Sequence, residues 1–459
     1  MFSSLRQPKD FYQRLYYLAL PVVLQNLITT SLGFMDTFMV GRLGNMEMAA
    51  VTGANVPIFI LQLVMFGFQS GMSVLISQYW GKKDVGSINR VLGIALYAVT
   101  ALTGTVALLM FFRPLFVLRL IMHDEQLVLL ARPYLQLVGI SYVFDGVCSV
   151  YSGMQRSTEN PVFGMRVFAV AMGCNTFGNY ILIFGKLGAP QLGITGAAVA
   201  TLASRVIEFI ITVVYALRSR RIPLLPAAIL RPGKAMLRSF LRYSTPVVCN
   251  ETLWSLGTSM LTVVMGHMEN SVDMLAAYAV MGNIDKFSTV ICFGVASATA
   301  VIIGKEIGEG RSREQVGSSA SALLAVSLLV GLGTGILLLA LQRVFFIPVL
   351  FPFFKLYGSA AQIAEYMCLI FAFSMPLRAF DVTNITGVLR AGGDVTVAIC
   401  IDLLPLWLAA VPLSALFGLV LHTPPVWVCL AMQAENLFKL PVGLLRLRGG
   451  KWIHDITVT

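Results

Sequence analysis

The sequence predicts an all-α polytopic membrane protein with twelve transmembrane helices, arranged as two pseudo-symmetric six-helix lobes around a central cavity. Of its 459 residues, 57% are apolar and only 12% are charged, whereas a soluble protein carries about 25% charged residues. The apolar residues form long stretches, and motifs of the first half return in the second half. A chain of this composition cannot cover itself with a polar surface, so the lipid bilayer is the solvent that fits it.

Each predicted helix is a stretch long enough to cross the bilayer, which takes roughly 20 mostly apolar residues. The stretches are much longer than the roughly 10-residue alternating strands of an outer-membrane barrel, so helices are expected. Several exceed the minimum length, which predicts tilted helices or ends that protrude into water. In chain order the spans are 14–39, 47–79, 87–112, 125–152, 161–184, 193–217, 240–265, 273–304, 315–341, 357–388, 395–419 and 424–446.

The distribution of basic residues predicts the orientation. With the N-terminus in the cytoplasm, most of the 33 lysines and arginines fall in cytoplasmic segments, the largest group lying between Arg218 and Arg242. This bias follows the positive-inside rule and predicts a multi-pass protein of the inner (cytoplasmic) membrane with both termini in the cytoplasm. Because orientation explains the net charge of +11, no nucleic acid partner is expected.

The two halves of the chain resemble each other. Leu20-Pro21-Val22-Val23 matches Thr245-Pro246-Val247-Val248 at an offset of 225 residues, and Ser152-Gly153-x-x-Arg156 matches Thr386-Gly387-x-x-Arg390 at an offset of 234. Six spans in each half make the repeats parallel, a design that suits alternating access. The predicted domains are an N-lobe at 1–217, a cytoplasmic linker at 218–238, a C-lobe at 239–447 and a cytoplasmic tail at 448–459.

Charged residues inside the spans are candidates for function, because a charge near the bilayer centre costs several kcal/mol. Some of them have a local partner on the same helix. Arg205 with Glu208 and Arg378 with Asp381 are spaced i, i+3, and Glu435 with Lys439 is spaced i, i+4, so each pair can form an ion pair on one helix face. The spans also contain Asp145, Asp285 and Asp402.

Asp36 and Glu251 stand apart, because neither has a basic residue within one helical turn. An unpaired buried carboxylate holds either a proton or a cation. Both are therefore predicted to couple ion movement to transport, the alternative being a protonated carboxyl bonded to a neighbouring helix. Pro21 and Pro246 fall inside spans 1 and 7, where each permits a kink that is either a bending point or static.

Several motifs carry a resemblance to a known family. Phe34-Met35-Asp36-Thr37-Phe38-Met39-Val40-Gly41-Arg42 in span 1, Cys174-Asn175-x-x-x-Asn179-Tyr180 in span 5 and Gly387-x-Leu389-Arg390-Ala391-Gly392-Gly393-Asp394 after span 10 are the main ones. They resemble the signatures of the multidrug and toxic compound extrusion (MATE) family, bacterial type. The similarity runs through almost the whole chain, and it is the combination of motifs that is specific.

The resemblance implies an antiporter that exports cationic or amphipathic drugs and metabolites in exchange for Na⁺ or H⁺. It carries over Asp36, Asn175 and Asn179 as a cation site and Glu251 as the carboxylate of the C-lobe. Asn175 and Asn179 are spaced i, i+4, so their amides share one helix face, and a carboxylate with amide oxygens suits a hard cation. No other metal site is expected.

The chain departs from the family pattern at two positions where relatives carry an aspartate. DinF-type members have an aspartate where this chain has Asn179, and NorM-type members place their span-10 aspartate further ahead of the glycine than Asp381 is from Gly387. We therefore name Asp381, Asp402 and Asp145 only as candidates for an additional intramembrane site.

The predicted function is secondary antiport by alternating access. We expect no organic cofactor, a small cationic or amphipathic substrate, contact with membrane lipids and a monomer. The alternative is a flippase for lipid-linked precursors, which resembles this architecture but commonly has more basic residues in its cavity. An enzyme would need a His/Asp or Ser/His cluster in the spans, which the sequence does not show.

Overall fold

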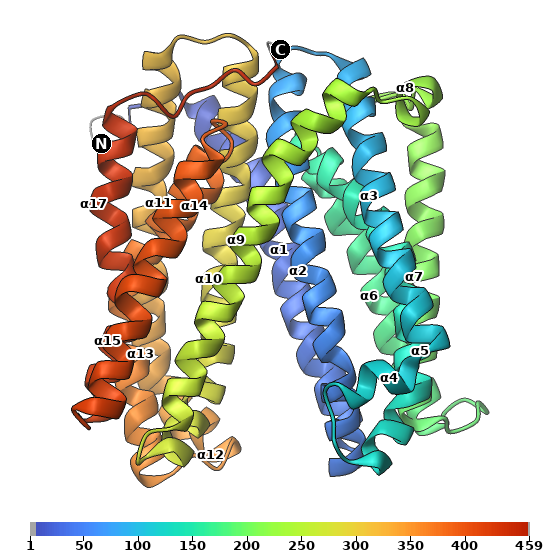
Figure 1. The fold of residues 1–459 in the computed structure, drawn as a ribbon, viewed down its shortest axis with the longest axis vertical. Coiled ribbons are helices and arrows are strands. Elements are labelled where there is room, and N and C mark those ends of the chain that lie inside the picture. The colour runs from blue at the N-terminus through green and yellow to red at the C-terminus, as the bar shows by residue number, and fades with distance from the viewer. Residues whose placement is uncertain (1–5, 458–459) are drawn as a thin grey trace. The chain divides into compact units, whose positions relative to one another are not determined.

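The computed structural model describes residues 6–457, and within them every regular element is a helix (Figure 1). Residues 1–5 of the predicted N-lobe and residues 458–459 of the predicted tail lie outside the described residues. Eleven helices are long and apolar enough to cross a membrane. The twelfth long helix, α9 (Lys234–Gly266), begins with several basic residues and carries Glu251 in its middle, which lowers its hydropathy.

The predicted spans agree with the helices to within a few residues at most ends, and the prediction of an all-α polytopic membrane protein is confirmed. The largest difference follows the ninth span, where the helix continues in π-helical form (η2, Gln342–Leu350) and a short α12 (Phe351–Phe353). The helices before α9 are α1 (Lys9–Gly41), α2 (Asn45–Gly81), α3 (Val85–Phe112), α4 (Pro114–Arg119), α5 (Glu125–Ser157), α6 (Pro161–Phe184), α7 (Gly193–Arg218) and α8 (Pro226–Leu230). After it come α10 (Ser271–Gly308), α11 (Arg313–Leu341), α13 (Gly358–Val382), η3 (Thr383–Leu389), α14 (Val395–Pro405), η4 (Leu406–Ala410), α15 (Val411–Ala415), η5 (Leu416–Val420), α16 (Pro425–Met432) and α17 (Ala434–Arg448).

Polar residues at the helix ends explain where several helices begin and stop. Asp84 accepts a hydrogen bond from the backbone N–H of Ser87 at 3.0 Å and so caps α3. Asp124 accepts from the N–H of Gln126 at 2.8 Å and caps α5 in the same way. These carboxylates satisfy N–H groups that have no partner within the helix. Gly185 ends α6 with a φ of 65°, a left-handed conformation that glycine adopts without a steric penalty.

The chain forms two compact units. Unit 2 comprises residues Leu24–Val248, and unit 1 comprises the described residues up to Val23 together with those from Cys249 onward. Within unit 2, α5 packs against α2, α3 and α7, and α6 packs against α7. Within unit 1, α10, α11 and α13 pack together, and α17 packs against α13 and α14. The lobe boundaries at 217 and 239 come from the sequence repeat and stay a prediction.

Two helices pass from one unit to the other. α1 crosses from unit 1 to unit 2 after Val23, and α9 crosses from unit 2 to unit 1 after Val248. Val23 and Val248 occupy equivalent positions of the repeat, and each lies two residues after the proline of its helix, Pro21 or Pro246. The first half of each helix therefore packs with the opposite repeat. The role of the two prolines as bending points stays a prediction.

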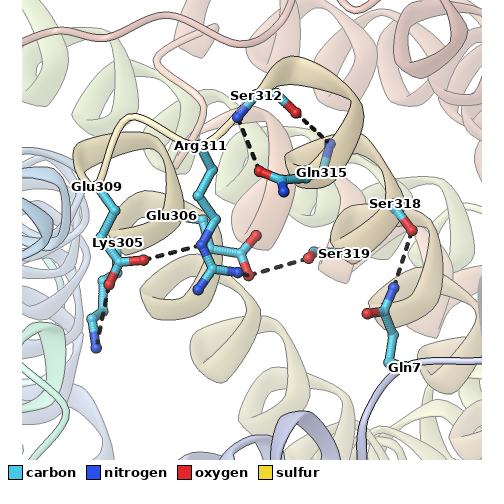
Figure 2. A network of polar contacts seen from close by, with 9 residues as sticks. All are labelled: Gln7, Lys305, Glu306, Glu309, Arg311, Ser312, Gln315, Ser318 and Ser319. Atoms are coloured by element: carbon cyan, nitrogen blue, oxygen red, sulfur yellow. Dashed lines mark hydrogen bonds and ion pairs between the residues drawn. The ribbon is translucent and has the colours of Figure 1, made fainter.

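The first half of α1 and the residues just before it are held to the rest of unit 1 by both polar and apolar contacts. Figure 2 shows Gln7 donating a hydrogen bond to Ser318 Oγ at 3.0 Å, beside a network in which Arg311 and Ser319 both bind the buried carboxylate of Glu306 at 3.0 and 3.1 Å. Further along α1, an apolar cluster with the ends of α10 and α11 includes Leu15, Leu18 and Ala19. Because lipid is as apolar as leucine, this attachment rests on close packing and hydrogen bonds rather than on removal of these side chains from water.

The C-terminal residues fold back onto unit 1. Trp452 is 1% exposed and packs on the loop between η3 and α14. A Cβ at Gly392 would lie 2.6 Å from the carbonyl oxygen of Trp452, and the N–H of His454 donates to the carbonyl of Gly392 at 2.8 Å. Arg446 also binds the carboxylate of Asp394 at 2.7 Å. The close approach explains why glycine stands at position 392.

Gly294 and Gly67 each make a close contact to the first half of α1 or of α9, which packs with the opposite repeat. A Cβ at Gly294 of α10 would overlap Cγ2 of Val23, with the nearest backbone atom at 3.3 Å. A Cβ at Gly67 of α2 would lie 2.5 Å from Cγ2 of Val248 and 2.8 Å from its Cα. The first overlap is thus with a side-chain methyl, whereas the second extends to backbone.

We expect the two glycines to differ in whether a second substitution rescues them. Gly294→Ala and Gly67→Ala should each destabilise the protein by about 1–3 kcal/mol through overpacking. Val23→Ala should restore much of the loss in Gly294→Ala because it removes the overlapping methyl. Val248→Ala should not rescue Gly67→Ala, since Cα and N of residue 248 remain. Melting temperatures in detergent measure all four variants.

Gly282→Ala, on the same helix as Gly294, is the matched control, since nothing lies within 4 Å of a Cβ at that position. Equal rescue of both glycine variants, or of neither, would contradict the contacts described.

Candidate functional site

Asp36 of α1 and two amides of α6 meet inside unit 2. The Nδ2 group of Asn179 donates to Asp36 Oδ1 at 2.7 Å and to Asn175 Oδ1 at 3.1 Å, and Asn175 in turn donates to Thr201 Oγ1 on α7 at 3.2 Å. Asn175 and Asn179 are 4% and 2% exposed. The structure thus brings together the three residues named for the cation site and adds Thr201.

These residues line a cavity of about 220 Å³ within unit 2. That volume is below the roughly 300–1,000 Å³ of sites for drug-sized ligands, but it accommodates an ion with several waters. Its wall is mixed, with Asn55 and Tyr134 joined by a hydrogen bond at 3.3 Å, and with apolar side chains such as Met172. A cavity of this size beside a carboxylate, inside a membrane domain, is an environment for a small cation with a few waters.

The donor set fits either a proton or a hard cation. Asn179 Oδ1 is buried and has no hydrogen-bond partner among the described residues. Rotation of this amide by half a turn would present its oxygen to the side on which Asp36 lies. Carboxylate, amide and hydroxyl oxygens from Asp36, Asn179 and Thr201 are the ligand types that a hard cation such as Na⁺ takes.

A buried ion triad lies in the same unit. Arg205 of α7 binds Asp145 of α5 at 2.8 Å and Glu208 at 2.6 Å. The i, i+3 pair that the sequence offered is therefore formed, and Asp145 joins it from another helix. Arg205 also lines the cavity of Asp36 and lies over the ring of Phe168 at 5.5 Å. Because Arg205 already binds two carboxylates, its guanidinium is not free to neutralise Asp36.

In unit 1 the structure corrects the picture of Glu251. The sequence suggested an unpaired carboxylate, but Arg390 binds Glu251 Oε1 at 3.0 Å. Arg390 was expected in a loop after span 10. The chain instead continues from α13 into the π-helical η3, and Arg390, directly after it, is only 2% exposed. A coupling role for Glu251 stays a prediction, now for an acid that is ion-paired with Arg390 in this structure.

Asp402 of α14 is also paired. It binds Lys439 of α17 at 3.0 Å, accepts a hydrogen bond from Asn250 of α9 at 2.9 Å, and lies 3.9 Å from Arg390. Lys439 binds Glu435 at 3.0 Å as well, which is the i, i+4 pair suggested by the spacing. Sequence reasoning did not name Arg390 as a site residue because the residue was expected in the loop after span 10, and it named Lys439 only as a partner of Glu435.

Asp381 of α13 differs from Glu251, Asp285 and Asp402, three ion-paired acids described in unit 1. The spacing offered Arg378 as its partner, but Arg378 binds Asp285 of α10, with Nη2 to Oδ2 at 2.9 Å. Asp381 is 4% exposed, and neither of its carboxyl oxygens has a hydrogen-bond partner among the described residues. A carboxyl group in this setting is commonly neutralised by a proton or a cation.

The family model named MatE matches residues 21–181 and 246–416, one segment in each half of the chain. The chain belongs to the MatE family. The resemblance to the multidrug and toxic compound extrusion family is thereby confirmed, and so is the prediction of a transporter. The two matched segments begin at the equivalent positions 21 and 246, in agreement with the internal repeat.

Relatives of this MatE protein cover nearly its whole length. The Bacillus subtilis transporter YisQ is 24% identical, covering 98% of this chain and 97% of its own. A probable multidrug resistance protein NorM of Thermotoga maritima is 25% identical, covering 98% and 95%. Among solved structures, the MATE transporter VcmN of Vibrio cholerae superposes with a TM-score of 0.85 at 18% identity, covering 97% and 98%. The alternative of a flippase gains no support from these relatives.

Proposed function

We propose that this MatE protein is a secondary antiporter that exports organic cations or amphipathic drugs and metabolites in exchange for Na⁺ or H⁺. The observation that carries the proposal is the hydrogen-bonded set of Asp36, Asn179 and Asn175 around a 220 Å³ cavity. The names of relatives such as the Thermotoga NorM protein support multidrug export as the substrate class. The protein would act as a monomer in the inner membrane, in contact with lipids and with both termini in the cytoplasm.

The proposed cycle uses competition for carboxylates. With the transporter open to the outside, Na⁺ or H⁺ binds at Asp36 and the amides of Asn175 and Asn179, and the exported cation leaves. The loaded protein then opens to the cytoplasm, where substrate displaces the small ion. Coupling requires that ion and substrate favour different states, because a ligand with equal affinity for both states shifts nothing.

Unit 1 would contribute a second ion site. Asp381 is the strongest candidate there, since it is buried and its carboxyl oxygens have no hydrogen-bond partner within residues 6–457, whereas Glu251 and Asp402 each have a basic partner. The Glu251 and Asp402 pairs would then hold η3, α14 and α17 in place around it.

The coupling ion is tested with purified protein in proteoliposomes, under a Na⁺ gradient and a pH gradient imposed separately. Efflux of a fluorescent organic cation should follow at least one of the gradients and should stop when an ionophore collapses it. Equal efflux with and without both gradients would contradict antiport.

A further inference from the structure

Arg156, at the end of α5, lies in a second cavity of unit 2. This cavity has a volume of about 70 Å³, and its polar wall includes Gln25, Gln69, Ser149 and Ser152. Arg156 is half-buried, and within residues 6–457 the structure gives it no ion pair or hydrogen bond. An unneutralised guanidinium in a polar cavity is costly unless water or an anion meets it.

The internal repeat shows what is missing around Arg156. Its counterpart at the offset of 234 is Arg390, which binds Glu251 at 3.0 Å and lies 3.9 Å from Asp402. The offset of 225 that relates the prolines places Asn26 where the second half has Glu251. The first half thus has the arginine but not this acid.

Asp402, the second acid near Arg390, has no acidic counterpart in the first half either. The offset of 234 holds at the start of the next helix, since α6 begins at Pro161 and α14 at Val395. The counterpart of Asp402 is therefore Phe168, and Phe168 lies in the wall of the Arg156 cavity. The ring of Phe168 therefore lines the same cavity as Arg156, at the position where the second repeat has the carboxylate of Asp402.

The remaining acid in the wall does not compensate for the loss. Glu208 lines the cavity, but its carboxylate binds Arg205 at 2.6 Å, and no ion pair joins it to Arg156 in the described part of the chain. The cavity therefore combines the guanidinium of Arg156 with amide and hydroxyl donors and with one carboxylate that Arg205 already binds, which is the chemistry of an anion site.

We propose that the Arg156 cavity binds a small monovalent anionic group, either a free anion of the size of chloride or formate or the carboxylate of a transported substrate. Its volume of about 70 Å³ exceeds the 10–15 Å³ needed for one water several times over, but it is too small for a whole drug. The proposal goes beyond the proposed antiport and does not depend on which ion drives it.

The binding test uses the full-length protein in detergent, without gradient or substrate. Sodium chloride or sodium formate is titrated against sodium gluconate at constant Na⁺, because gluconate is too large for the cavity. A ligand that binds only the folded state raises the melting temperature in a saturable way. We expect this rise in the wild type and in Arg166→Gln, which removes an exposed positive charge from neighbouring α6.

Two variants should lose the rise by different routes. Arg156→Gln removes the charge but keeps donors, and Asn26→Glu rebuilds the acid that the second repeat carries beside Arg390. Arg156→Lys keeps the charge and should keep the rise. A wild type without a saturable response, or an Arg156→Gln variant that responds as the wild type does, would overturn the proposal.

A transport measurement separates the two sources of the anion. In chloride-free vesicles, uptake of an amine that carries a carboxylate is compared with uptake of its methyl ester. A KM for the acid that rises several-fold in Arg156→Gln, with an unchanged KM for the ester, identifies the substrate carboxylate. If the ratio of the KM for the acid to the KM for the ester is the same in Arg156→Gln as in the wild type, and the chloride response depends on Arg156, the ligand is a free anion.

Discussion

Replacing Asp36 by asparagine is expected to reduce ion-driven efflux to the level of vesicles without the protein. The variant keeps the shape of the side chain and can still form a hydrogen bond with Asn179, which Asp36 accepts at 2.7 Å in the wild type. It cannot take up a proton or balance the charge of Na⁺. Without differential binding of the small ion there is no coupling. Efflux of an organic cation under imposed Na⁺ and pH gradients measures the loss.

Asp10→Asn is the matched control for this variant, since Asp10 lies in the first turn of the same helix and is exposed. It should transport as the wild type does. The yield and gel-filtration profile of Asp36→Asn should be normal, which would separate a loss of coupling from a loss of folding. Wild-type efflux by Asp36→Asn would remove this residue from the mechanism.

Replacing Arg205 by alanine is expected to have the largest effect on stability, a loss of about 3–5 kcal/mol. The substitution leaves Asp145 and Glu208 facing each other in the interior without the guanidinium that binds them at 2.8 and 2.6 Å. Removing one partner of a buried ion pair leaves a charge with no compensation. Unfolding in mixed micelles of increasing denaturing detergent measures the change.

Removal of all three charges should cost less than removal of Arg205 alone. The triple variant Arg205→Met, Asp145→Leu and Glu208→Met buries no charge, and replacement of a buried ion group by apolar residues of similar volume is often close to neutral. Arg218→Ala, at the exposed end of the same helix, is the control for loss of a positive charge. An Arg205→Ala variant as stable as the wild type would show that the triad carries no stabilising interaction.

The helices of this protein could be read from the sequence because hydropathy and length alone decide them in a membrane. The i, i+3 pair of Arg205 and Glu208 and the i, i+4 pair of Glu435 and Lys439 were also visible, since their geometry is set within one helix. The proximity of Asn175 and Asn179 follows from the same helical spacing.

Pairs between helices could not be read from spacing. Arg378 has an acid three residues away in Asp381 but binds Asp285, which is 93 residues distant in sequence. Glu251 and Arg390 are 139 residues apart. These choices depend on how each helix is rotated about its axis and on the π-helical turns of η3, and neither leaves a signal in a single sequence. The repeat is the one signal that points to Arg390, through its match with Arg156.

The exchange of half-helices between the two units has a consequence for biosynthesis. The segment around the start of α1 leaves the ribosome well before its partners in unit 1, since 311 residues separate Gln7 from Ser318. At about 5–20 residues per second this segment waits roughly 15–60 s in the bilayer before its binding surface exists. Until then Leu15 and Leu18 face lipid or an insertion factor, so faults in this stretch would arrest assembly at its last stage.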